Sequence, residues 1–150
     1  MDMNSLAQQR NELKSKLSRI RVVLHVGKYT PVCAHCGLPI YDGKPDMHEV
    51  FLTRGDINDK SSDLLFMIMV RYNCVLLHHK CHHLAGTMTS QVKCIKHLIR
   101  YEGYDKIRDW LEELNDTMKG RQAEDALRLL KEVYYDPKNM WNLRPASRQA

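Results

Sequence analysis

Two short pairs of metal-ligand residues constrain this chain more than any other feature of its sequence. Cys33 and Cys36 are separated by two residues, and so are His78 and Cys81 far downstream. Each pair can bind one metal ion from a single tight turn, and four cysteine or histidine ligands form the tetrahedral set of a structural zinc site. The spacing therefore predicts a zinc ion that joins two distant parts of the chain, with the ligands Cys33, Cys36, His78 and Cys81. Rival donors nearby are His35, His79, His82 and His83.

Other uses of these cysteines fit the sequence less well. The chain has five cysteines, an odd number, and its first residues lack the apolar segment of a secretory signal. We therefore expect a cytoplasmic protein with reduced thiols, which disfavours a disulfide framework. A finger with two cysteines and two histidines needs a link of about 12–15 residues, whereas 41 residues separate Cys36 from His78. The zinc nucleobase deaminases place H-x-E upstream of their cysteine pair. In this chain the pair Cys33 and Cys36 instead lies upstream of His48 and Glu49, which are adjacent.

Further residues around the two pairs extend the pattern. The segment Met47-His48-Glu49-Val50-Phe51 lies between them, and the second pair sits in the run Asn73-x₄-His78-x₂-Cys81-His82. Together with the first pair, the stretch from Cys33 to Gly86 resembles the zinc-stapled form of the HNH (His-Me finger, ββα-metal) endonucleases. It is also similar to small HNH proteins encoded by bacteriophages.

The resemblance implies a metal-dependent endonuclease that hydrolyses phosphodiester bonds in DNA, by nicking or by double-strand cleavage. It implies that His48 is the general base, that Asn73 orients this base, and that His82 binds a catalytic Mg²⁺ or Mn²⁺ ion. Asp46 and His83 are further candidate ligands for that ion. These roles suit the residue types, because a neutral imidazole can accept a proton from water near pH 7 and a divalent ion can stabilise a leaving oxygen.

One departure from the family pattern leaves the identity of the base open. Many members place Asp or His directly before the base, whereas Met47 precedes His48, and a thioether is a poor ligand for a hard cation. If the two apolar residues that usually follow the base are matched to Val50 and Phe51, His48 becomes a metal ligand and Glu49 becomes the base. We favour His48 as the base, because imidazole accepts protons at neutral pH.

The pattern divides the chain into four parts. Residues 1–30 contain leucine and isoleucine at helical spacing among basic residues, which predicts an N-terminal basic helix. Residues 31–88 form the zinc-stapled core, with strands near 46–53 and 74–77. Residues 89–136 form an extension of three helices, the first capped by Thr89 or Ser90 and ended by Gly103. Residues 137–150 form a tail. The expected fold is α+β: a small ββα-metal core with helical extensions.

Charge and hydropathy indicate the partners. The formal net charge is +5 and the isoelectric point is about 9.0, which suits a polyanion such as double-stranded DNA. Arg54, Arg71 and Lys80 are candidates for phosphate contacts. The longest apolar run, residues 64–70, is far shorter than the roughly 18 residues that span a bilayer, so we expect no membrane segment.

Two other interpretations stay open at the level of sequence. The chain could be a catalytically decayed, zinc-stabilised module that binds nucleic acid, for which Met47 is the sequence support. It could instead be a subunit of a DNA packaging or recombination complex, in which the C-terminal helices bind a protein partner.

Overall fold

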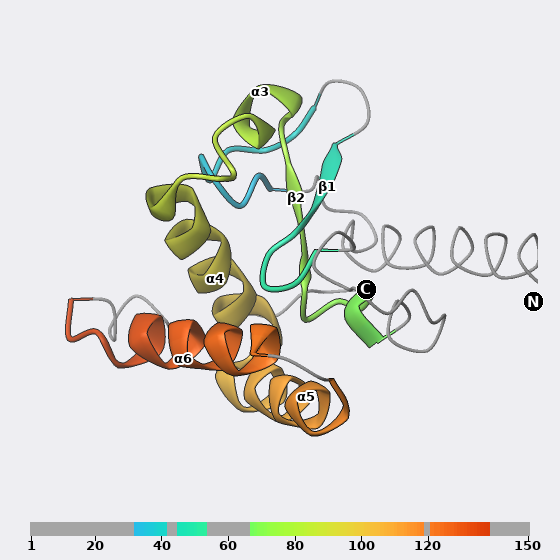
Figure 1. Ribbon diagram of the computed structural model, residues 1–150. Helices are drawn as coiled ribbons and strands as arrows, with labels where there is room; N and C mark the ends of the chain where they lie inside the picture. The colour runs from blue at the N-terminus through green and yellow to red at the C-terminus, as the bar shows by residue number, and fades with distance from the viewer. Residues whose placement is uncertain (1–31, 42–44, 54–66, 119–120, 139–150) are drawn as a thin grey trace, which may run out of the picture.

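A computed structural model describes residues 32–41, 45–53, 67–118 and 121–138 (Figure 1). The N-terminal helix predicted in 1–30, Arg54 and most of the predicted tail lie outside these ranges. The described residues form a mixed α+β structure with two strands and four helices: β1 (Asp46–Glu49), β2 (Cys74–Leu77), α3 (His79–His82), α4 (Met88–Glu102), α5 (Tyr104–Thr117) and α6 (Gln122–Tyr135). Among these helices, none has the length and apolar character needed to cross a membrane.

The two strands form an antiparallel pair at the centre of the part of the chain that carries the predicted zinc ligands, which we call the metal-rich half. Asp46 lies opposite Leu77 and Glu49 lies opposite Cys74. All four residues of β2 are buried, which fits its uniformly apolar sequence Cys74-Val-Leu-Leu77 and its contacts with β1 and α4. The strand predicted at 74–77 is confirmed. The other strand ends at Glu49, four residues before the predicted end.

A buried asparagine explains why β1 ends early. After Glu49 the chain turns toward Asn73, whose Oδ1 accepts hydrogen bonds from the backbone N–H groups of Phe51 (2.8 Å) and Leu52 (3.2 Å). Its Nδ2 donates to the carbonyl oxygens of Leu52 (2.7 Å) and Ile68 (2.9 Å). These four bonds use the full hydrogen-bonding capacity of the amide, which is completely buried. The amide thus takes the place of strand pairing for residues 51 and 52.

The three predicted C-terminal helices are present, with one correction. The first, α4, begins at Met88 because Thr87 is its N-cap: the Thr87 hydroxyl accepts a hydrogen bond from Ser90 N at 3.2 Å. The predicted caps Thr89 and Ser90 are therefore wrong. The hydroxyl of Ser90 instead lies 2.9 Å from Nδ1 of His35. Gly103 ends α4 as predicted, with a φ of +93° that favours glycine.

The helices and the metal-rich half share one hydrophobic core. Buried side chains of β2 pack in the same cluster as those of α4, α5 and α6, including Val75, Leu98, Leu111 and Leu130. Polar contacts cross the same boundary. Trp110 Nε1 donates to Met67 O at 2.8 Å, and Arg71 Nε contacts Oε2 of the buried Glu102 at 2.6 Å. The segment 89–136 is thus packed directly against the core that it follows.

We expect Asn73→Ala to lower the free energy of unfolding by about 2–4 kcal/mol, because it leaves four buried or partly buried backbone groups without their partner. Asn115→Ala, at an exposed position of α5, is the control and should change stability by less than about 0.5 kcal/mol. Urea unfolding followed by circular dichroism measures both values. Equal stability of the two variants would contradict this role for Asn73.

Candidate metal centre and adjoining histidine site

The first ligand pair lies in a tight turn that presents both sulfurs to one side. Gly37, with φ +76°, lets the turn close, and its N–H donates to Cys33 O at 2.9 Å. Cys33 N donates to Leu38 O at 2.9 Å. A further bond from Ala34 N to Leu76 O at 3.0 Å attaches this turn to β2. The position of the cysteine pair is therefore fixed relative to the sheet.

The second ligand pair is formed where β2 passes into α3. His78 is the N-cap residue of α3, and its carbonyl oxygen accepts hydrogen bonds from Cys81 N and His82 N, both at 3.0 Å. Residues three apart on a helix share a face, so His78 and Cys81 point toward the first turn. The sheet and α3 together bring the two distant pairs to one place.

The four predicted zinc ligands form a compact cluster. The ligand atoms of Cys33, Cys36, His78 and Cys81 all lie within 4.8 Å of one another. Nδ1 of His78 is 3.3 Å from Sγ of Cys36 and 4.0 Å from Sγ of Cys81. A tetrahedral zinc ion with ordinary bond lengths separates its ligand atoms by about 3.6–3.8 Å. The cluster could therefore hold a structural metal ion such as zinc.

A hydrogen bond fixes the tautomer of His78 in the form that a metal requires. Nε2 of His78 lies 3.0 Å from the carbonyl oxygen of Pro39. Because a carbonyl oxygen can only accept, Nε2 carries the proton and the lone pair of Nδ1 faces the sulfurs. Histidine ligands of metals typically donate their second N–H to a backbone carbonyl in this way.

The pKa values of the thiols show why the cluster suits a cation. Burial raises the pKa of Cys33, but backbone N–H groups of Cys36, His78 and His35 outweigh burial and lower this pKa to about 7. Burial and the neighbouring Cys33 raise the pKa of Cys81 to about 11. One thiolate therefore forms readily and opposes ionisation of its neighbour. A divalent cation among the sulfurs would remove this repulsion.

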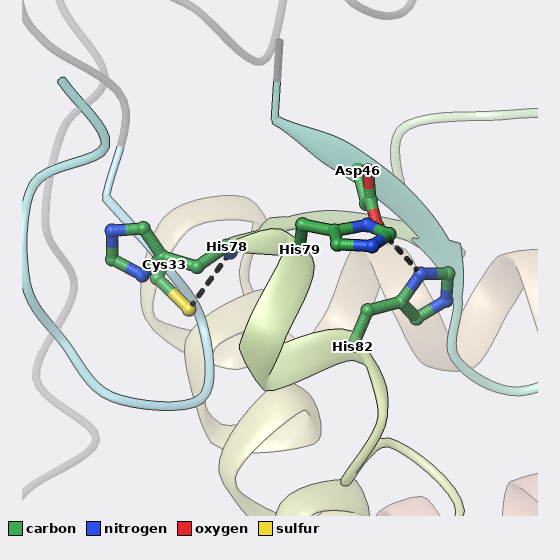
Figure 2. A network of polar contacts seen from close by, with 5 residues as sticks. All are labelled: Cys33, Asp46, His78, His79 and His82. Atoms are coloured by element: carbon green, nitrogen blue, oxygen red, sulfur yellow. Dashed lines mark hydrogen bonds and ion pairs between the residues drawn. The ribbon is translucent and has the colours of Figure 1, made fainter. Parts of the chain in front are cut away.

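A second group of side chains lies on the other side of α3. Figure 2 shows Cys33 beside His78 at one side of this helix, and Asp46 of β1 close to His79 and His82 at the other. Oδ2 of Asp46 is 2.9 Å from Nδ1 of His79 and 3.0 Å from Nδ1 of His82. The contact with His79, and after it the contact with His82, lowers the pKa of Asp46 although partial burial opposes this. Asp46 and His82 remain 27% and 39% exposed, so solutes can reach them.

His48 adjoins this group. It lies two residues after Asp46 on β1, so strand alternation places both side chains on the same face. Its ring centroid is 5.3 Å from that of His82, with an angle of 64° between the rings. Burial lowers the pKa of His48, and the charge of His82 lowers it further. The same alternation places Glu49 on the opposite face of β1.

The other predicted site residues lie elsewhere. His83 is exposed, directly after α3, with its ring 5.2 Å from that of His79. The Asn73 amide bonds to backbone, so it can position His48 only through the loop that follows β1. Arg71 pairs with Glu102, Lys80 is exposed on α3, and Arg54 lies outside the described residues.

Sequence reasoning did not assign His79 to this second group. Its signal was the spacing of three residues from His82, which puts both imidazoles on one side of a helix. That signal became informative only once Asp46 was known to lie opposite. Comparisons of the chain with protein-family models, with curated proteins and with solved structures gave no match. The function must therefore be inferred from the residues of the site.

We expect the purified protein to contain one zinc ion per chain, and Cys33→Ser to lose this zinc together with the fold of the metal-rich half. Structural zinc contributes on the order of 10 kcal/mol to the folding of small domains. Cys94→Ala removes a buried thiol outside the four-residue cluster and should keep the zinc. Elemental analysis and circular dichroism test both variants. Retention of stoichiometric zinc by Cys33→Ser would contradict the assignment.

Proposed function

We propose that this chain is a metal-dependent endonuclease that hydrolyses phosphodiester bonds in DNA. The observation that supports this function best is the group formed by Asp46, His48 and His82. It combines a carboxylate 3.0 Å from one imidazole with a second imidazole 5.3 Å from the first, measured between ring centroids. The group lies on an antiparallel pair of strands followed by a short helix, beside a cluster suited to structural zinc, as the resemblance to HNH endonucleases implies.

The donor atoms of this group suit a divalent ion different from the one in the cysteine cluster. Asp46 and His82 would hold it, and Nδ1 of His79 contacts the same carboxylate oxygen at 2.9 Å, although the three residues do not form a compact ligand cluster like that of the cysteines. Carboxylate oxygen with imidazole nitrogen suits Mn²⁺ and similar ions better than Mg²⁺, which prefers oxygen and water. When bound, such an ion supplies charge stabilisation for the phosphate and its leaving oxygen.

His48 is the residue best suited to activate the attacking water. Its lowered pKa keeps the imidazole neutral near pH 7, so it can accept a proton. The water oxygen would attack phosphorus as its proton passes to His48, and the bond from phosphorus to the leaving sugar oxygen would break. Glu49 belongs to the opposite face of β1, which favours His48 over Glu49 in this role.

The proposed base is tested by substitution. We expect His48→Ala to lower cleavage of supercoiled plasmid by about 10²–10⁴-fold, the usual contribution of a general base. Glu49→Gln should keep most of the activity, and His83→Ala, which changes an exposed histidine next to α3, is the control. Zinc content should be unchanged in all three variants. If His48→Ala and Glu49→Gln both cleave at the wild-type rate, the nuclease mechanism fails and a nucleic-acid-binding module is the better interpretation.

The proposed ion site is tested by binding. Isothermal titration of the zinc-loaded protein with Mn²⁺ should give a dissociation constant that His82→Ala raises by about tenfold or more, because a direct ligand is lost. His83→Ala should leave it within about twofold. Circular dichroism should show the same fold for both variants, because the cysteine cluster is separate from Asp46 and His82. Equal Mn²⁺ affinities would exclude His82 as a ligand.

A further inference from the structure

The outer face of α4 differs from the exposed surfaces of α5 and α6 in its charge. The buried residues of α4 are Ser90, Cys94, Ile95, Leu98, Ile99 and Glu102. At 100° per residue, the opposite side of the helix carries Lys93, Lys96, His97 and Arg100, which we call the basic face of α4. Lys93 and Arg100 are exposed, and Lys96 and His97 are half-buried. The only acidic residue of α4, Glu102, is buried and paired with Arg71.

The two following helices show what an ordinary solvated surface looks like in this protein. Helix α5 has five acidic and two basic residues, and its Arg108 lies 3.2 Å from Asp105 and 3.1 Å from Asp109. On α6, Arg128 lies 3.8 Å from Asp125. Within the described ranges, by contrast, Lys93, Lys96 and Arg100 take part in no ion pair. Acidic and basic residues are thus mixed on α5 and α6 but not on α4.

This separation of charge is unfavourable for the protein alone. Lys96 and Arg100 are four residues apart, and Lys93 and Lys96 are three apart, so like charges are neighbours on the helix surface. Such pairs weaken a helix unless an anion neutralises them. A local conflict of this kind is expected where a surface serves binding.

We propose that the basic face of α4 binds the phosphate backbone of the DNA substrate. This inference rests on the proposed function for its choice of polyanion. Lys93 and Arg100 are separated by about 10 Å along the helix axis, at 1.5 Å per residue, which corresponds to about three steps of 3.4 Å between successive phosphates of one strand, measured along the DNA axis. In Figure 1 the sheet lies on one side of α4, and α4 begins soon after α3, which carries His79 and His82. The basic face therefore belongs to the first long helix after the proposed site in the sequence.

The proposed contact between the basic face of α4 and DNA does not depend on the base sequence. Lysine and arginine side chains on one helix face bind phosphates through charge, and each neutralised phosphate releases counterions. The number of contacts can therefore be read from the dependence of affinity on salt. For B-form DNA, the slope of log Kobs against log salt is about −0.9 per phosphate neutralised.

The test compares two triple variants with the same change of charge. The first is Lys93→Gln, Lys96→Gln and Arg100→Gln on the basic face of α4. The second is Lys106→Gln, Arg128→Gln and Lys131→Gln, at exposed positions of α5 and α6. Binding of each full-length protein to a fluorescent 20-base-pair duplex is measured by anisotropy between 50 and 300 mM KCl without divalent ions, so that cleavage does not interfere. Zinc content and circular dichroism establish that both variants are folded.

In the α4 variant we expect the slope of log Kobs against log salt to become less steep by about two to three units. We expect its affinity for the duplex at 100 mM KCl to fall roughly 10- to 100-fold. The control variant should stay near wild type. Equal weakening in both variants would mean that net charge alone drives binding and would overturn the proposal, as would an unchanged slope in the α4 variant. Should the α4 triple variant fold poorly, single Lys93→Gln and Arg100→Gln variants should each lose about one unit of slope, and no loss in either would overturn it.

Two further results separate this surface from the proposed activity. If the wild-type protein cleaves plasmid but the α4 triple variant binds the duplex as tightly as the wild type, the proposed DNA-binding surface is contradicted and the nuclease function still stands. A wild-type protein that binds the duplex through α4 without cleaving it would contradict the nuclease function and support the surface. Binding of phosphatidylserine vesicles in place of DNA, measured by co-sedimentation, would overturn the choice of partner.

Discussion

The meeting of two ligand pairs at one point is the constraint on which the rest of this structure depends. Cys33 and Cys36 come from a turn attached to β2, and His78 and Cys81 come from the first turn of α3. A helix of four residues has too few internal hydrogen bonds to be stable alone. Its position is set by the strand that precedes it, by the tautomer-fixing bond from His78 to Pro39 and by the ligand cluster. Because α3 is fixed in this way, the side of the helix from which each of its other side chains projects is set as well.

The short helix separates two kinds of donor atom. One side carries His78 and Cys81 toward the sulfurs, and the other carries His79 and His82 toward Asp46. A sulfur-rich set favours zinc, whereas a set of carboxylate oxygen and imidazole nitrogen favours harder ions such as Mn²⁺. Under the proposed function the two sets would bind different ions, although His78 and His79 are adjacent in the sequence. In the proposed nuclease this arrangement lets one ion stabilise the fold while the other remains accessible to a phosphate.

The sequence was most informative where the chemistry depends on spacing. Ligands separated by two residues predicted the cluster, the apolar run at 74–77 predicted β2, and helical periodicity with Gly103 predicted α4 to α6. It was least informative where a side chain bonds to a distant part of the chain. The early end of β1 depends on Asn73, the pairing of Arg71 depends on Glu102, and the contact of His79 depends on Asp46. No local pattern encodes these partners, because only the folded chain brings them together. The N-cap at Thr87 was missed because three nearby hydroxyl residues have similar capping ability.

The helices also explain how so small a metal-rich half can hold a defined site. About fifty residues bury little apolar surface, so such a segment is only marginally stable without a metal ion or further packing. Here α4 covers β2, and Trp110 of α5 contacts Phe51 and Tyr72 with ring centroids 6.3 Å apart in each case. Phe51 and Tyr72 flank the backbone that Asn73 holds together, so α5 packs on the same end of the strand pair. The two ends of the strand pair are thus stabilised by different means: the ligand cluster at the end that carries Asp46, and aromatic packing at the end beyond Glu49. His48 lies between them, on a strand that is held from both directions.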